Sequence, residues 1–167
     1  MRKSFGIGAL ALVLALAATQ GCGGNPLIGT WRLDFRALLT PAQQMYVTEA
    51  YSDMTFNGDG TLVVDSRSVA TNTAPLLASC VIAGHATGLT WNAMMNAGVN
   101  SVTVGGSPMG TQSRSMCMDP SMNVATMPID PGTMAVMGSF NYTIMGSTLT
   151  MTTNSGMGTT TLTLTRR

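Results

Sequence analysis

The sequence predicts an all-β fold, an up-and-down antiparallel barrel of about eight strands with one short helix after the first strand. Apolar residues alternate with polar residues in many short segments, which is the period of a half-buried strand. Clusters of Gly, Asn, Asp and Ser separate these segments and indicate turns. Because sequential strands pair readily and closure removes exposed sheet edges, such a meander favours a barrel.

The first predicted strand is followed by a helix start. Trp31, Leu33 and Phe35 alternate with polar residues and share one face of an extended segment. Residues 40–43 read Thr-Pro-Ala-Gln, which places a threonine cap, a proline at the first helical position and a glutamine at the third. This pattern predicts a short helix that runs to about Val47.

The middle of the chain predicts a hairpin and three further short strands. Residues 51–56 are extended, residues 57–60 (Asn-Gly-Asp-Gly) carry a strong turn signal, and residues 61–65 form the return strand. An EF-hand calcium loop laid over this turn would begin at Thr55 and end at Ser66, which lack the carboxylates needed there, so we interpret residues 57–60 as a turn. The further strands are predicted at 79–83, 88–92 and 99–104, the first two on either side of Gly84 and His85.

The last third of the chain shows the clearest alternation. Segments 140–144, 148–152 and 161–165 each place apolar residues on one face and mainly threonine or asparagine on the other. Gly146 and residues 154–158 mark the turns between them. Threonine suits the solvent face because its β-branched side chain packs well on a pleated surface.

Residues 105–138 follow no regular period and are rich in Met, Ser, Gly and Pro. We therefore predict a long irregular excursion there, at one end of the sheet.

The chain has 3 cysteines, Cys22, Cys80 and Cys117. If Cys22 carries lipid and the chain is exported, the oxidising environment favours a disulfide between Cys80 and Cys117. A metal or redox pair is the alternative, but no Cys-x-x-Cys spacing is present, and we expect no metal and no cofactor.

The first 21 residues are predicted to be a signal peptide outside the fold. Two basic residues precede an apolar run at 7–18, which is short for a membrane span. Gly21 and Cys22 at its end resemble the lipobox of bacterial lipoproteins, in which the cysteine is lipidated and becomes the new N-terminus. An ordinary secretory signal or an uncleaved anchor helix are the alternatives. Residues 22–26 then form a tether and residues 27–167 a single domain.

The lipobox resemblance implies a chain that is exported and lipid-anchored to the bacterial cell envelope. In some bacterial lipoproteins an aspartate follows the lipidated cysteine and keeps the protein away from the outer membrane. This chain has Gly23 at that position, so the resemblance points to the outer membrane.

Only 9% of residues are charged and the net charge is +1. This excludes a basic nucleic-acid binder, because the phosphates of the nucleic acid would not be neutralised. The expected partners are thus the membrane, through the lipid, and a small hydrophobic ligand, with the protein a monomer.

Both ends of the domain carry a second resemblance. Gly29-Thr30-Trp31 opens the first strand, the hairpin at 56–62 follows, and Arg166 closes the last strand. This pattern resembles the lipocalin-like domains found in bacterial lipoproteins. In that superfamily the Gly-x-Trp motif places a tryptophan at the closed barrel end, and a late arginine packs across it. The resemblance therefore implies a cation–π contact between Trp31 and Arg166.

The function expected from the sequence is binding of a small apolar ligand by a membrane-anchored barrel. A structural or interaction module with a filled core is one alternative, since small barrels can be packed solid. A copper-binding envelope protein is another, because the chain has 15 methionines and thioethers select Cu(I). His85 is the single histidine and belongs to no recognised catalytic motif, so we expect no enzymatic activity.

Overall fold

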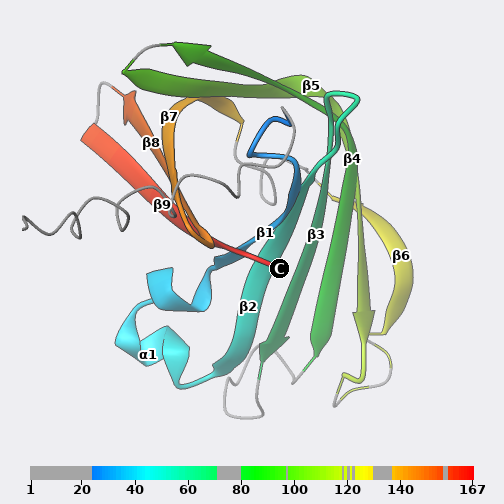
Figure 1. Cartoon of the computed structure of the whole chain (residues 1–167). Helices are drawn as coiled ribbons and strands as arrows, with labels where there is room; N and C mark the ends of the chain where they lie inside the picture. Colours follow the sequence, from blue (N-terminus) through cyan, green and yellow to red (C-terminus); the bar gives the residue numbers. More distant parts are fainter. Residues whose placement is uncertain are drawn as a thin grey trace, which may run out of the picture.

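A computed structural model describes residues 24–70, 80–96, 98–117, 119, 121, 123–129, 137–155 and 158–167. Cys22 and the predicted signal peptide lie outside these residues. The described chain is mostly β-strand, with a 3-10 helix and one α-helical turn (Figure 1). The elements are β1 (Gly29–Asp34), η1 (Arg36–Leu38), α1 (Pro41–Gln44), β2 (Val47–Phe56), β3 (Thr61–Ala70), β4 (Val81–Asn96), β5 (Val99–Ser115), β6 (Val124–Ile129), β7 (Gly138–Met145), β8 (Thr148–Ser155) and β9 (Gly158–Arg166).

Eight of the strands close into an antiparallel barrel, as the alternation predicted. The sheet order is β4-β3-β2-β1-β9-β8-β7-β5-β6, and pairing of β4 with β5 completes the ring. The two halves of β5 have different neighbours. Asn100 to Val104 pair with β7, whereas Gly110 to Arg114 pair with β6, which lies outside the ring. The barrel is therefore extended along β5 by one additional strand.

The barrel core is filled by side chains from every strand of the ring. Trp31 and Leu33 of β1 point inward, as predicted, and are 0% and 2% exposed. Burying each large apolar side chain stabilises the fold by about 1.5–3 kcal/mol. The buried cluster comprises Leu27, Trp31, Leu33, Met54, Phe56, Leu62, Val64, Ala86, Leu89, Trp91, Val102, Val104, Phe140, Tyr142, Leu149, Met151, Leu162 and Leu164.

The local signals for the first hairpin and the short helix are confirmed. Thr40 and Gln43 form a reciprocal capping box, with Pro41 at the helix start. The helix ends at Gln44, earlier than predicted, because β2 already begins at Val47.

Among the described residues, no helix has the length and apolar character needed to cross a bilayer.

The prediction of two short strands around Gly84 and His85 is wrong. A single strand, β4, runs from Val81 to Asn96, and residue 79 lies outside the described part of the chain. Gly84 pairs with Ser66 on β3 and with Gln112 on β5. Hydrogen bonds on both sides hold this glycine extended, so its local preference for a turn is overridden.

The prediction that residues 105–138 are irregular also needs correction. β5 continues through Gly105 and Gly106 to Ser115, and β6 spans Val124–Ile129. The part of β5 beyond Gly106 was not recognised because mainly polar and small residues occupy both of its faces, which removes the apolar alternation. Residues 130–136 within the same segment lie outside the described residues.

The long β4–β5 hairpin is bent at a pair of glycines. Gly88 and Gly106 have φ values of +73° and +111°, which favour glycine. A Cβ atom on Gly106 would lie 2.5 Å from the Gly88 carbonyl oxygen. The register shifts at this point, between Thr87 and Leu89, which marks a β-bulge. Beyond the bulge the hairpin crosses one side of the barrel and reaches β7 (Figure 1).

Candidate functional site

The residues of the Gly-x-Trp pattern lie together where β1 begins and β9 ends, which we call the Trp31 end. Trp31 and Arg166 are opposite one another in the β1–β9 ladder. The Arg166 guanidinium lies over the indole ring, with its carbon 5.2 Å from the ring centroid. Its Nη2 also donates to the carbonyl oxygen of Ile28 at 3.0 Å. The predicted cation–π contact is therefore present.

Gly29 and the indole nitrogen complete this arrangement. Gly29 has a φ of +126°, and a Cβ atom there would lie 3.3 Å from Nη2 of Arg166. Trp31 Nε1 donates to the carbonyl oxygen of Leu27 at 2.8 Å, so the buried indole has its partner. These contacts pack the described residues at the Trp31 end against one another, and we call this arrangement the seal.

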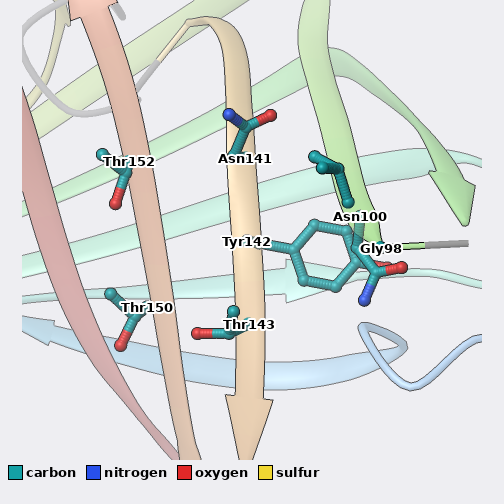
Figure 2. Close-up of a pocket in the computed structure, with 8 residues that line it drawn as sticks. Gly98, Asn100, Asn141, Tyr142, Thr143, Thr150 and Thr152 are labelled. Carbon is teal, nitrogen blue, oxygen red and sulfur yellow. The ribbon is translucent and has the colours of Figure 1, made fainter. Parts of the chain in front are cut away.

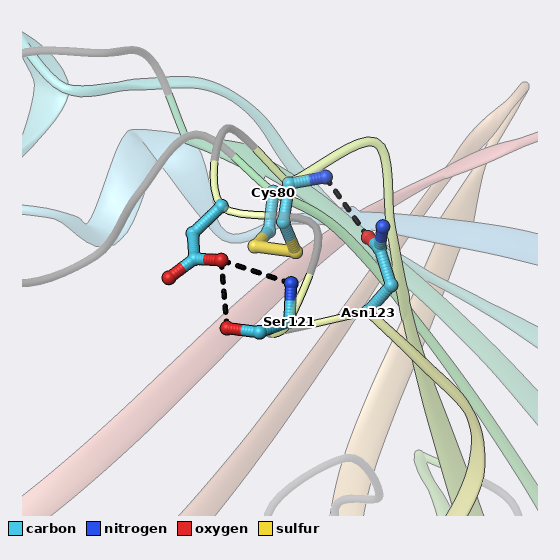
Figure 3. The surroundings of a disulfide bond; sticks show 5 residues. Cys80, Ser121 and Asn123 are labelled. Atoms are coloured by element: carbon cyan, nitrogen blue, oxygen red, sulfur yellow. Dashed lines mark hydrogen bonds between the residues drawn. A yellow bond between two sulfur atoms is a disulfide. The ribbon is translucent and has the colours of Figure 1, made fainter.

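Cys80 and Cys117 form the predicted disulfide at the opposite end of the barrel (Figure 3). This end, where α1 leads into β2, is called the α1 end. The backbone N–H of Cys117 donates to Oδ1 of Asn123 at 3.1 Å. Nearby, the Ser121 hydroxyl and then its backbone N–H donate to Asp119 and lower the pKa of that carboxyl. The disulfide thus ties the start of β4 to the turn before β6.

A hollow of about 220 Å³ opens at the α1 end. We call it the α1-end hollow, and its lining consists of Phe35, Ala50, Tyr51, Ser52, Ser66, Arg67, Ser68 and Ile82. Ser52, Ser66 and Ser68 continue the inward-facing rows of Met54 and Val64, because successive inward residues on a strand are two apart. The large apolar residues that fill the rest of the barrel are replaced here by small hydroxyl side chains.

Within the described part of the chain, two buried polar atoms on this inner face have no hydrogen-bond partner. One is Oγ of Ser52, which is 0% exposed, and the other is Nε of Arg114 on β5. Arg114 lies opposite Ile82 in the β4–β5 ladder, and Ile82 in turn lies opposite Ser68. A buried polar group without a partner is uncommon in folded proteins. Sequence reasoning missed both residues, because only the strand register brings them to one face.

A second depression, of about 310 Å³, lies over β7 and β8 on the barrel wall. Figure 2 shows the threonines of these strands along it and the Tyr142 ring extending toward Asn100. The Tyr142 hydroxyl is buried without a partner, and burial raises the pKa of this phenol. The lining is formed by Gly98, Val99, Asn100, Asn141, Tyr142, Thr143, Thr150 and Thr152.

His85 lies on the outer face of β4 and not in a turn. Its Nδ1 is 2.7 Å from Oδ1 of Asp65 on β3, and the two side chains are 53% and 59% exposed. This pairing was not visible in the sequence, since 20 residues separate the two positions. A depression of about 300 Å³ beside the pair is lined with hydroxyl groups, including those of Thr111 and Ser113. A contact this exposed is screened by water and contributes little to stability.

No group of three or more His, Cys, Asp or Glu residues is arranged to hold a metal ion within the described ranges. Most of the described methionines are on the surface, whereas Met54 and Met151 belong to the core. Met94 and Met95 are 58% and 57% exposed near the tip of the β4–β5 hairpin. Met118 and Met134 lie outside the described residues. The exposed methionines are Met45, Met94, Met95, Met109, Met116, Met127, Met137 and Met145.

Comparison with known proteins found no matching family model, no matching curated protein and no matching solved structure.

Proposed function

We propose that this chain is a lipid-anchored, lipocalin-like barrel of the bacterial cell envelope that binds a small, mainly apolar molecule and catalyses no reaction. The observation that supports the proposal is that the two ends of the barrel interior are filled to different extents. Large side chains fill the interior from the Trp31 end onward, whereas small side chains leave the α1-end hollow. A barrel that served only as a packed scaffold has no need of small residues at one end.

The shape and lining of the hollow define the class of ligand. Phe35, Ala50 and Ile82 provide apolar walls beside the serines. A volume of about 220 Å³ is smaller than the pockets that hold drug-sized molecules, which are about 300–1,000 Å³. At about 30 Å³ for each water molecule, it corresponds to roughly seven waters. The ligand is therefore a small molecule, or one end of a longer molecule.

The lipid anchor is proposed from the sequence around Cys22 and agrees with the course of the described chain. Leu27 is 0% exposed at the Trp31 end, so the predicted tether precedes a residue fixed in the core. The anchor would then attach the sealed end of the barrel to the membrane. Replacing Cys22→Ser is expected to release the protein from the membrane fraction of the producing cells. Retention of the variant in that fraction would contradict lipidation.

Native mass spectrometry of the protein purified from its own membrane tests ligand binding. The expected spectrum contains the acylated protein with one additional small molecule. In the variant Ser68→Phe, an aromatic ring occupies the hollow, and the additional mass should disappear. Thr163→Phe is the matched control, since it adds the same ring at an exposed position on β9. Equal ligand occupancy in both variants would place the ligand elsewhere.

The filled core also supports the alternative, a structural or interaction module of the envelope. Every strand of the ring contributes buried apolar side chains, so the barrel is stable without a ligand. This alternative predicts that the purified protein carries no additional mass and that Ser68→Phe changes nothing but local packing. The same mass spectrum thus separates the two functions.

A further inference from the structure

We infer that the α1-end hollow selects a small organic carboxylate, whose carboxylate group is held by Arg114 and Ser52. This inference rests on the proposed function, and it specifies the chemistry of the ligand. Three observations support it, namely the position of Arg114, the absence of a counter-ion for it among the described residues, and the lining of the hollow beside it.

The strand register places Arg114 on the inner face of the barrel wall. Arg114 is opposite Ile82, and Ile82 is opposite Ser68, so the three side chains form one row across β5, β4 and β3. The Cβ atoms of residues paired in this way are about 4.5–5.5 Å apart. Ile82 and Ser68 line the hollow, whereas Arg114 lies one strand beyond Ile82 and is not itself among the lining residues. Rotation about its flexible side-chain bonds would bring the guanidinium to the rim.

Within the described part of the chain, no carboxylate forms an ion pair with Arg114. Two other arginines have carboxylate partners: Arg32 with Asp53, and Arg67 with Glu49. Arg166 instead lies over an indole ring. The Nε atom of Arg114 is buried and has no acceptor. A partly buried cation with an unused donor favours an anion brought by a ligand, because water no longer solvates it fully.

Ser52 supplies a second unused donor, a hydroxyl group, on the same inner face. Its Oγ is buried without a partner, and the residue lines the hollow. A carboxylate oxygen accepts hydrogen bonds from both hydroxyl and guanidinium donors, and a guanidinium matches a carboxylate in a planar fork. A single uncompensated cation also balances a monoanion, whereas a doubly charged phosphate would bring an excess negative charge. The remaining walls, Phe35 and Ile82, fit a small apolar body.

The experiment uses 4-fluorobenzoate as the probe and 4-fluorobenzamide as its uncharged analogue of nearly the same shape. Binding to the purified full chain, held in phosphatidylcholine nanodiscs, is followed by fluorine NMR, with empty nanodiscs as the blank. We expect the benzoate to bind on the order of tenfold more tightly than the benzamide, as one charge-assisted contact predicts. Arg114→Gln should abolish that preference by weakening benzoate binding alone.

Arg167→Gln is the matched control, because it removes the same charge at the Trp31 end and should leave both affinities unchanged. Thermal unfolding of both variants verifies that each remains folded. Ser52→Ala should reduce benzoate affinity less than Arg114→Gln does, since it removes one neutral donor. Inorganic phosphate at equal concentration should not displace the benzoate.

The possible results distinguish this inference from the proposed function. If benzoate and benzamide bind equally well and neither depends on Arg114, the carboxylate selectivity is wrong while small-molecule binding stands. If phosphate displaces the benzoate at equal concentration, the site recognises oxyanions in general and the assignment to carboxylates is wrong. If neither aromatic probe binds, both the inference and the proposed binding of small molecules in this hollow are contradicted.

Discussion

The guanidinium of Arg166, in the last strand, lies over the ring of Trp31, in the first, and the two residues face one another in the β1–β9 ladder. Arg166 also donates to the carbonyl oxygen of Ile28, and its own backbone N–H donates to Ser147. One residue therefore joins the beginning of the domain, its last strand and the β7–β8 turn. The seal at this end forms only when the last strand is in place.

Replacing Arg166→Ala is expected to lower the free energy of unfolding by about 1–2 kcal/mol, because a cation–π contact and a hydrogen bond are lost together. Urea denaturation measures the change. Arg167→Ala serves as the control, since the backbone hydrogen bond from Arg167 to Thr30 survives that substitution. Equal losses in the two variants would show that the contact with Trp31 contributes nothing.

Gly106→Ala is expected to destabilise the barrel by at least about 2 kcal/mol, since both the backbone conformation and the contact are unfavourable. The new methyl group would meet the Gly88 carbonyl oxygen at 2.5 Å and the Thr90 nitrogen at 3.1 Å. Gly105→Ala is a closely matched control, because a Cβ atom there meets nothing within 4 Å. Thermal unfolding compares the two, and a similar midpoint would mean that the bend tolerates side chains.

Removing the disulfide by the double substitution Cys80→Ala and Cys117→Ala is expected to lower stability by about 3–4 kcal/mol. The bond closes a loop with a sequence separation of 37 residues, so it restricts the unfolded chain considerably. Guanidinium denaturation with and without reductant measures the effect. The stability of the double variant should not change when reductant is added. If reductant still lowers its stability, the loss does not come from the Cys80–Cys117 bond.

The β2–β3 turn should weaken at acid pH through Asp59. The Thr61 hydroxyl and then the Thr61 backbone N–H donate to this carboxylate and lower its pKa below the ordinary value of 3.8. A lowered pKa contributes stability that is present above the ordinary pKa and is lost as the pH falls through the folded one. The difference in melting temperature between the protein and Asp59→Asn should therefore shrink below about pH 4. A difference that is constant down to pH 2 would contradict this.

The features that depend on neighbouring residues could be predicted from the sequence. The alternation around Trp31 and Leu33, the turn at 57–60 and the cap at Thr40 each reflect contacts within a few residues. The barrel followed because these short segments occur in consecutive order. The disulfide was predicted from the small number of cysteines, once Cys22 was assigned to the lipid.

Features set by pairing between distant strands could not be predicted. β5 beyond Gly106 was missed because neither of its faces is apolar, and its neighbours on β4 and β6 determine its conformation. The approach of His85 to Asp65 depends on the β3–β4 register. The candidate ligand residues Ser52 and Arg114 share a face for the same reason, although they are far apart in the sequence. The register is set by pairing between strands across the whole sheet, so it cannot be predicted from residues that are neighbours in the sequence.

The first and last residues of the domain emerge at the same rim, because the backbone N–H of Arg167 donates to the carbonyl oxygen of Thr30. A domain held on a solid support through residue 24 or through Arg167 is therefore attached by the same rim. In such a preparation the cysteine-bridged rim faces outward. Solutes that diffuse from the bulk reach that rim without passing the attachment point.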